Sequence, residues 1–228
     1  MPPTVWPLSI IRSTRINFLQ LSYIGTHTDV GLATWDDLSG NGRHDTQGGA
    51  GTLQPAINTG GPGGKPYVTP DGVDDFMFNP FIPAGTGWLW MLARRKNATA
   101  NAVLINASSV GNVNFTIRQT GSPNIQMRNT AVGNSAACAV GTWFEIWAHF
   151  TGSTADELKV GSALPVTGAN ASNAGGVGGM YLGSAGGLSN FCSFDLIGKM
   201  HADTKPTADE RAELSRWVTA EFAGGIQV

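Results

Sequence analysis

The residues best suited to chemistry lie together in the segment 143–150. Trp143, Glu145, Trp147 and His149 occupy alternate positions, so in a β-strand they would project from one face. Tryptophan rings stack on sugar rings, and a neighbouring carboxylate or imidazole bonds to hydroxyl groups. The pattern therefore fits a carbohydrate-binding face. The same residues would serve a subunit interface, where tryptophan is enriched. The favoured interpretation is a second buried layer, with the helix or the N-terminal arm lying over it.

A second segment, 88–93, carries two further tryptophans. It is apolar at every position, which is typical of a strand covered on both sides. Trp88 and Trp90 occupy alternate positions here as well. We therefore place them with the first set as candidate carbohydrate-binding or interface residues.

Glycoside hydrolysis would need two facing carboxyl groups. Glu145 is the only acid in the segment 143–150. The other close acids, 36–37 and 74–75, lie in turn-forming sequences, where capping of the backbone accounts for them. The sequence therefore predicts that the protein is not an enzyme, with a hydrolase that depends on Glu145 as a remaining alternative.

The sequence contains one candidate metal site. Asp71, Asp74 and Asp75 would offer oxygen ligands to calcium. The same Asp-Gly-Val-Asp-Asp sequence is explained equally well as a turn that leads into a strand. The four histidines share no zinc-ligand spacing with each other or with Cys138 and Cys192. We expect no cofactor, with calcium at the three aspartates as the open alternative.

Composition narrows the classes of function. Only 13% of the 228 residues are charged, the formal net charge is −2 and glycine occurs 31 times. Low charge and abundant glycine favour a β protein with many turns over a helical bundle. Nucleic-acid binding normally needs a basic face, and the cations here are scattered. No stretch approaches the ~20 apolar residues of a membrane span, so we expect neither nucleic-acid binding nor membrane insertion.

Short apolar segments follow one another at intervals of about ten residues between Gly, Asn and Pro, a spacing that predicts a β-sandwich or barrel. One helix is expected over 207–223. Thr207 and Glu210 have the spacing of a capping box, and an apolar stripe follows at helical spacing. Gly224 and Gly225 would end the helix.

Residues 1–30 stand apart from the rest of the chain. Prolines at positions 2, 3 and 7 disfavour regular structure there, yet the segment is too apolar for a free tail. It is predicted to form either a first strand on the main domain or an arm that contacts a neighbouring subunit. The candidate contact residues of such an arm are Trp6, Ile10, Ile11 and Phe18.

Six short motifs follow one another in a characteristic order. They cover residues 35–47, 66–76, 141–147, 181–183, 194–198 and 207–214. Together they resemble concanavalin A-like (laminin G-like) jelly-roll domains of bacteriophage and bacterial surface proteins. The resemblance implies an all-β, concanavalin A-like jelly-roll β-sandwich over residues 31–228, with one C-terminal helix and an N-terminal arm. Such domains bind carbohydrate, cleave it or serve as structural modules, and the fold does not decide among these.

We expect a non-enzymatic structural or adhesion protein of a bacteriophage virion, such as a capsid decoration protein, head fibre or tail component. Residues 1–11 lack the pattern of a signal peptide, so the chain is expected to be made in a host cytoplasm and located in the virion. Its expected partners are further copies of itself, for example in a trimer, other virion proteins and host-surface glycans. The alternative is a carbohydrate-binding lectin module, and the third reading is a glycoside hydrolase of the concanavalin A-like fold.

Overall fold

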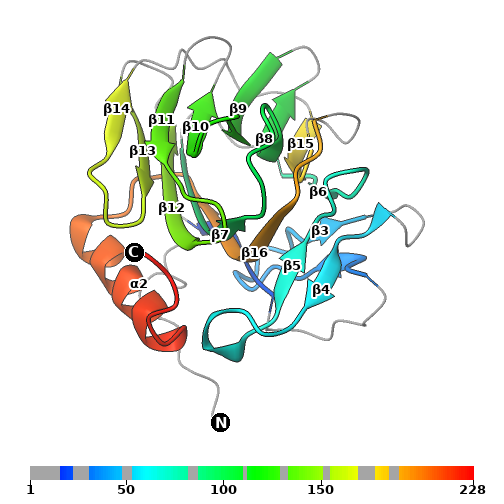
Figure 1. Ribbon diagram of the computed structural model, residues 1–228, viewed down its shortest axis with the longest axis horizontal. Helices are drawn as coiled ribbons and strands as arrows, with labels where there is room; N and C mark the ends of the chain where they lie inside the picture. The colour runs from blue at the N-terminus through cyan, green and yellow to red at the C-terminus, as the bar shows by residue number, and fades with distance from the viewer. Residues whose placement is uncertain are drawn as a thin grey trace.

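The described residues fold into two packed antiparallel sheets and a C-terminal helix (Figure 1). The computed structural model describes residues 16–22, 31–47, 53–81, 87–109, 112–128, 133–150, 155–168, 178–184 and 190–228. Within these residues, no helix is both long and apolar enough to cross a membrane.

Sheet A has eight strands, the longest of which lie at its centre. In spatial order they are β14 (Val166–Gly168), β13 (Asp156–Val160), β12 (Trp143–Phe150), β7 (Gly87–Arg95), β16 (Phe194–Ala202), β5 (Tyr67–Thr69) and β4 (Ala56–Asn58), and β1 (Ile16–Leu21) pairs with β16. A short 3₁₀ helix, Pro62–Gly64, connects β4 with β5.

Sheet B also has eight strands. In spatial order they are β11 (Asn134–Ala137), β10 (Asn124–Arg128), β9 (Asn112–Gln119), β8 (Val103–Ser109), β15 (Gly178–Leu182), β6 (Met77–Asn79), β3 (Asp45–Thr46) and β2 (Thr34–Trp35). Each sheet takes strands from both halves of the chain, so segments far apart in sequence pair with each other.

The main core lies between the sheets. It is built from inward residues that alternate along each strand, because successive side chains of a strand point to opposite faces. On β12, for example, Phe144, Ile146 and Ala148 face this core, whereas Trp143 and Trp147 face the other way into a second apolar cluster.

The second cluster lies between sheet A and helix α2 (Ala208–Glu221). The helix begins where predicted: Thr207 accepts a hydrogen bond from the Glu210 N–H, and the Glu210 carboxylate accepts one from the Thr207 N–H, which completes the capping box. Leu214 and Val218 of the helix are buried against the tryptophans of the sheet. The helix therefore covers the outer face of sheet A.

The two sheets and the helix confirm the prediction of an all-β jelly-roll sandwich with a C-terminal helix. Residues 16–21 form β1, which pairs antiparallel with β16. Phe18 lies within this strand, opposite His201, whereas Trp6, Ile10 and Ile11 lie outside the described residues. The expected contacts of the arm with a neighbouring subunit therefore stay a prediction.

The turn motif 35–47 is connected to strand β1 by hydrogen bonds to one carboxylate. The Asp37 carboxylate accepts hydrogen bonds from the N–H groups of Leu19, Ser39 and Arg43. Burial raises the pKa of Asp37, but these three backbone donors outweigh that effect and leave it below its ordinary value. Asp37 is thus a structural acid that caps its own turn and anchors β1.

Candidate functional site

The tryptophan face predicted to bind sugar or a subunit is the floor of the second cluster. Trp88 and Trp90 are 0% exposed, Trp147 is 2% exposed and Trp143 is 7% exposed. Because Leu214 and Val218 of α2 pack on this face, its tryptophan rings form part of the interior and are not presented to solvent.

Glu145 lies in the middle of this buried face. Its Oε1 accepts a 2.8 Å hydrogen bond from Trp90 Nε1, and its Oε2 accepts a 2.7 Å hydrogen bond from Ser215 Oγ on α2. Burial raises the pKa of Glu145, and the bonds from Ser215 and Trp90 oppose that rise. Oε2 therefore holds the helix on the sheet and Oε1 joins β12 to β7, while the Glu145 side chain is 0% exposed.

His149 marks the edge of the same face and is only half-buried. Its ring stacks on Trp88 with the centroids 4.4 Å apart. Burial lowers the pKa of His149, the cation of Lys205 lowers it further, and the Glu157 carboxylate opposes both. Of the six predicted residues on this face, His149 is the one that solvent reaches most readily.

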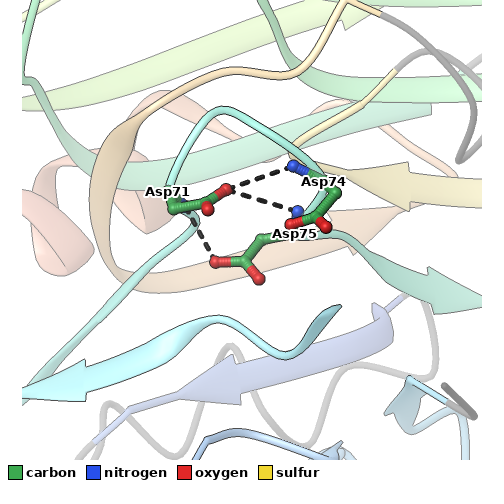
Figure 2. Close-up of side chains that lie close together, drawn as sticks. All are labelled: Asp71, Asp74 and Asp75. Atoms are coloured by element: carbon green, nitrogen blue, oxygen red, sulfur yellow. Dashed lines mark hydrogen bonds between the residues drawn. The ribbon is translucent and has the colours of Figure 1, made fainter. Parts of the chain in front are cut away.

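The three predicted calcium ligands do come together (Figure 2). One carboxylate oxygen each from Asp71, Asp74 and Asp75 lies within 4.8 Å of the others. The cluster is held by a turn, because Asp71 Oδ1 accepts from the N–H groups of Val73, Asp74 and Asp75, and the Asp71 N–H donates to Asp75 Oδ2. The hydrogen bonds account for Asp71 as a turn cap, so calcium binding here stays a prediction.

Asp75 is the buried member of this cluster. Burial raises the pKa of its carboxyl group to about 6, the hydrogen bond from the Asp71 N–H lowers it, and the negative charges of Asp71 and Asp74 raise it. Asp75 directly precedes Phe76 and strand β6. The aspartate turn therefore leads directly into strand β6 of sheet B.

The outer face of sheet B carries a continuous row of side chains across six strands. Thr34 pairs with Thr46, Thr46 with Phe78, Phe78 with Tyr181, Tyr181 with Asn106 and Asn106 with Thr116. The neighbours of these residues along each strand, including Trp35, Met77 and Met180, face the main core, so the row faces away from it.

An aromatic group forms the middle of this row. The Phe78 and Tyr181 rings are 5.0 Å apart, and the Phe76 ring lies 6.3 Å from that of Tyr181. All three are partly exposed, unlike the tryptophans beneath α2. Gly179 makes room for the pair: a Cβ at this position would lie 2.5 Å from the Phe78 ring. The sheet thus presents aromatic rings to solvent at its centre.

Polar groups flank the aromatic rings on the strands β8, β9 and β10. Thr116 Oγ1 donates to Asn106 Oδ1 at 3.3 Å. On the neighbouring row, Arg118 donates through Nε and Nη2 to Gln126 Oε1 at 2.9 and 2.6 Å. A planar guanidinium, amides and hydroxyls beside aromatic rings are the groups that orient a polar ligand.

This row was not among the sites predicted from the sequence. The alternating pattern of Met77-Phe78-Asn79 and Met180-Tyr181-Leu182 was available as a signal, since each places an aromatic residue between two inward residues. The strands are short, however, and nothing local shows that 78 and 181 are neighbours. Their pairing depends on the order of strands in sheet B.

No protein-family model matches the sequence, and no curated protein sequence matches it. Solved structures do share the fold. A Trypanosoma rangeli sialidase in complex with 2,3-difluorosialic acid has a TM-score of 0.67 at 8% identity, over 97% of this chain and 36% of that chain. An arabinofuranosidase complexed with arabinofuranosyl-α-1,2-xylobiose has a TM-score of 0.64 at 12% identity, over 83% of this chain and 51% of that chain.

A third similar structure is the binding domain of Paraclostridial Mosquitocidal Protein 1. Its TM-score is 0.62 at 12% identity, over 90% of this chain and 52% of that chain. This chain therefore spans about a third of the sialidase and about half of the other two chains. At these identities the likeness establishes the fold, a β-sandwich of the jelly-roll type, and each match covers part of a longer chain.

These comparisons correct two expectations. The prediction of a non-enzymatic bacteriophage virion protein is wrong, because the neighbours are glycoside hydrolases and the binding domain of a mosquitocidal protein. The prediction that the protein is not an enzyme is contradicted by the same glycoside hydrolases. The sequence did not predict the class of function because β-sandwich proteins with structural roles and those that act on carbohydrate share turn motifs and a low charge.

Proposed function

We propose that this chain is a carbohydrate-recognition module and that its ligand lies across the outer face of sheet B. The observation that carries the proposal is the partly exposed group of Phe76, Phe78 and Tyr181 at the centre of a row of polar side chains. Aromatic rings offer an apolar surface to the face of a sugar ring, while amides and hydroxyls bind its edge.

The dimensions of the row suit an extended ligand. Neighbouring strands are about 4.8 Å apart, so the five intervals from Thr34 to Thr116 span about 24 Å. That length accommodates several sugar rings of an oligosaccharide chain. We therefore expect the module to bind chains of sugars more tightly than single sugars.

The chemistry beside one end of the row favours acidic sugars. Arg118 is partly exposed and is held in position by Gln126 on the next strand. A guanidinium that is fixed in this way presents a planar cation suited to a carboxylate. Neutral sugars would use the hydroxyl groups of Thr34, Thr46 and Thr116 instead, because Asn106 is only 4% exposed.

The named neighbours support the same class of ligand. Two of them are structures of glycosidases with bound sugars or sugar analogues, and the third is called a binding domain. The motifs that resemble concanavalin A-like (laminin G-like) domains are compatible with this class of ligand, because carbohydrate binding is one of the roles of such domains. Because the chain covers only part of each neighbour, the proposal concerns recognition by this module.

A glycan array, followed by calorimetry on the best ligand, tests the proposal. We expect the wild-type chain to bind one group of glycans and Tyr181→Ala to lose at least tenfold in affinity, about 1.4 kcal/mol. Leu164→Ala is the matched control, since Leu164 is an 87% exposed apolar residue on the β13–β14 hairpin of the other sheet. Absence of binding across a broad array, or equal loss in both variants, would overturn the proposal.

Glycoside hydrolysis is the second candidate, favoured by the sialidase and arabinofuranosidase among the similar structures. It is tested by incubating the array ligands with the chain and measuring reducing-sugar release. Of the described residues, Asp71, Asp74 and Asp75 form the one cluster of three carboxylates. Release that disappears in Asp75→Asn would favour hydrolysis, and binding without release would favour recognition.

A further inference from the structure

Lys199 and Asp45 form an ion pair in the middle of the sandwich. Lys199 lies on β16 of sheet A, Asp45 lies on β3 of sheet B, and the side chain of each is 1% exposed. The Lys199 Nζ is 2.8 Å from Asp45 Oδ2. The contact therefore joins the two sheets through the interior, away from the surface row proposed to bind carbohydrate.

The two oxygens of Asp45 have different surroundings. Oδ1 accepts hydrogen bonds of 2.8 Å from Gln20 Nε2 and 2.8 Å from Asn79 Nδ2. Oδ2 is buried and has the Lys199 Nζ beside it. One oxygen is thus held by two amides, while the other faces the amine.

The neighbours of Asp45 are themselves fixed. Gln20 Nε2 also donates to the Trp35 carbonyl, and Asn79 Nδ2 also donates to the Arg43 carbonyl. Both amides therefore point their N–H groups at Oδ1 as part of the folded structure. Two such donors stabilise negative charge on a carbonyl oxygen in the manner of an oxyanion hole.

Keeping this pair ionised in the core is costly. Moving a charged group out of water costs several kcal/mol per ion even after relaxation, and mutual attraction repays this only in part. Burial accordingly lowers the pKa of Lys199, while the negative charge of Asp45 opposes that change. A neutral product would remove both buried charges.

We propose that Lys199 and Asp45 condense to an isopeptide bond that links the two sheets covalently. A bond forms between Lys199 Nζ and Asp45 Cγ, and the bond between Cγ and Oδ2 breaks. Two protons of the ammonium group leave with Oδ2 as one water molecule, which leaves a neutral amide. The step needs no oxidant, reductant or added reactant.

The residues around the pair can assist the condensation. Gln20 and Asn79 hold Oδ1, the oxygen that stays in the product, and stabilise the tetrahedral intermediate. The fold supplies proximity, since reacting groups held in place reach effective concentrations of about 10⁵–10⁸ M. Gln20 and Asn79 are positioning residues, because they act through Asp45.

Mass spectrometry of the denatured full-length chain tests the proposal directly. We expect the folded protein to weigh one water molecule less than its sequence mass. Trypsin should then fail to cleave after Lys199 and should release a branched peptide that joins residues 44–94 to residues 160–211. A chain that keeps its full sequence mass and is cleaved normally after Lys199 would overturn the proposal.

Two variants, Lys199→Arg and Asn79→Ala, distinguish the cross-link from other reactions that remove one water molecule from the chain. Succinimide formation at Asp71-Gly72 also removes one water molecule, but it leaves Lys199 open to trypsin and persists in Lys199→Arg. In Asn79→Ala, which removes one donor to Oδ1, we expect at least tenfold slower bond formation after refolding. Even if both variants fail to fold, the peptide map of the wild-type chain decides the matter.

Discussion

Ser215 on helix α2 donates a 2.7 Å hydrogen bond to the buried Oε2 of Glu145 on strand β12. The other oxygen of Glu145 accepts from Trp90 Nε1, so one carboxylate joins helix, strand β12 and strand β7. A residue with the appearance of a catalytic acid is thereby a structural link. Its substitution should change stability rather than ligand binding.

We expect Glu145→Ala to lower the free energy of unfolding by about 2–4 kcal/mol, because it leaves the Trp90 N–H and the Ser215 hydroxyl without an acceptor. Glu145→Gln keeps an acceptor and a polar partner and removes the buried charge, so its stability at pH 7 should equal or exceed that of the wild type. Urea unfolding followed by fluorescence measures both. Equal losses of unfolding free energy in the two variants would contradict a role of Glu145 as a hydrogen-bond acceptor that links helix and sheet.

Trp147→Ala should destabilise the fold strongly. The side chain is 2% exposed and lies beneath α2, where its ring is 5.8 Å from that of Trp88. Removing a buried large aromatic side chain typically costs about 3–5 kcal/mol. Thermal unfolding with glycan binding measured well below the midpoint separates stability from function. A stable Trp147→Ala protein that has lost glycan binding would place the ligand on the tryptophan face instead.

Asp75 gives the stability a defined pH dependence. Its pKa of about 6 in the fold exceeds its ordinary value of 3.8, so the folded state binds the proton more tightly than the unfolded state. This group therefore favours folding below pH 4 and loses that contribution as the pH rises from about 4 to about 6. Asp75→Asn should be more stable than the wild type at pH 7.5 by about 1–3 kcal/mol.

The difference between Asp75→Asn and the wild type should shrink below pH 4. The measurement is urea unfolding at several pH values in the presence of EDTA, which removes any bound cation. A wild type that gains stability when calcium replaces EDTA, with Asp75→Asn unaffected, would instead support the predicted calcium site. A difference that is independent of pH would contradict the raised pKa.

Gly179→Ala should disturb the aromatic centre of sheet B. Its φ angle is +141°, and a Cβ there would lie 2.3 Å from the Asn79 carbonyl oxygen and 2.5 Å from the Phe78 ring. We expect a loss of about 1–3 kcal/mol in stability and weaker glycan binding. Gly141→Ala is the control, since its φ is +82° and no atom lies near the added Cβ. Glycan binding that Gly179→Ala leaves intact would argue against the Phe78–Tyr181 pair as the binding centre.

Local features of this fold could be predicted from sequence because they depend on nearby residues. The alternation in 143–150 defined the two faces of β12, and Thr207 with Glu210 marked the start of α2. A buried layer beneath the helix was the favoured interpretation of the tryptophan face, but the sequence left two other roles open because burial depends on where α2 packs. Ser215 reaches Glu145 across 70 residues of chain.

The candidate binding row could not be predicted from the sequence. Phe78 and Tyr181 are far apart in the sequence, and each is one outward residue in a short strand. Only the strand order of sheet B makes them neighbours. The same holds for Asp45 and Lys199, which the packing of the two sheets brings to 2.8 Å.

A map of the ligand on the molecule tests whether carbohydrate binds to the outer face of sheet B. We would titrate the isotope-labelled chain with its best array glycan and record backbone amide chemical shifts. We predict that the largest changes fall on Phe78, Tyr181, Asn106 and Thr116, while Trp90 and Glu145 beneath α2 stay unchanged. Changes concentrated around α2, or on residues 71–75 alone, would contradict the assignment of the outer face of sheet B as the carbohydrate site.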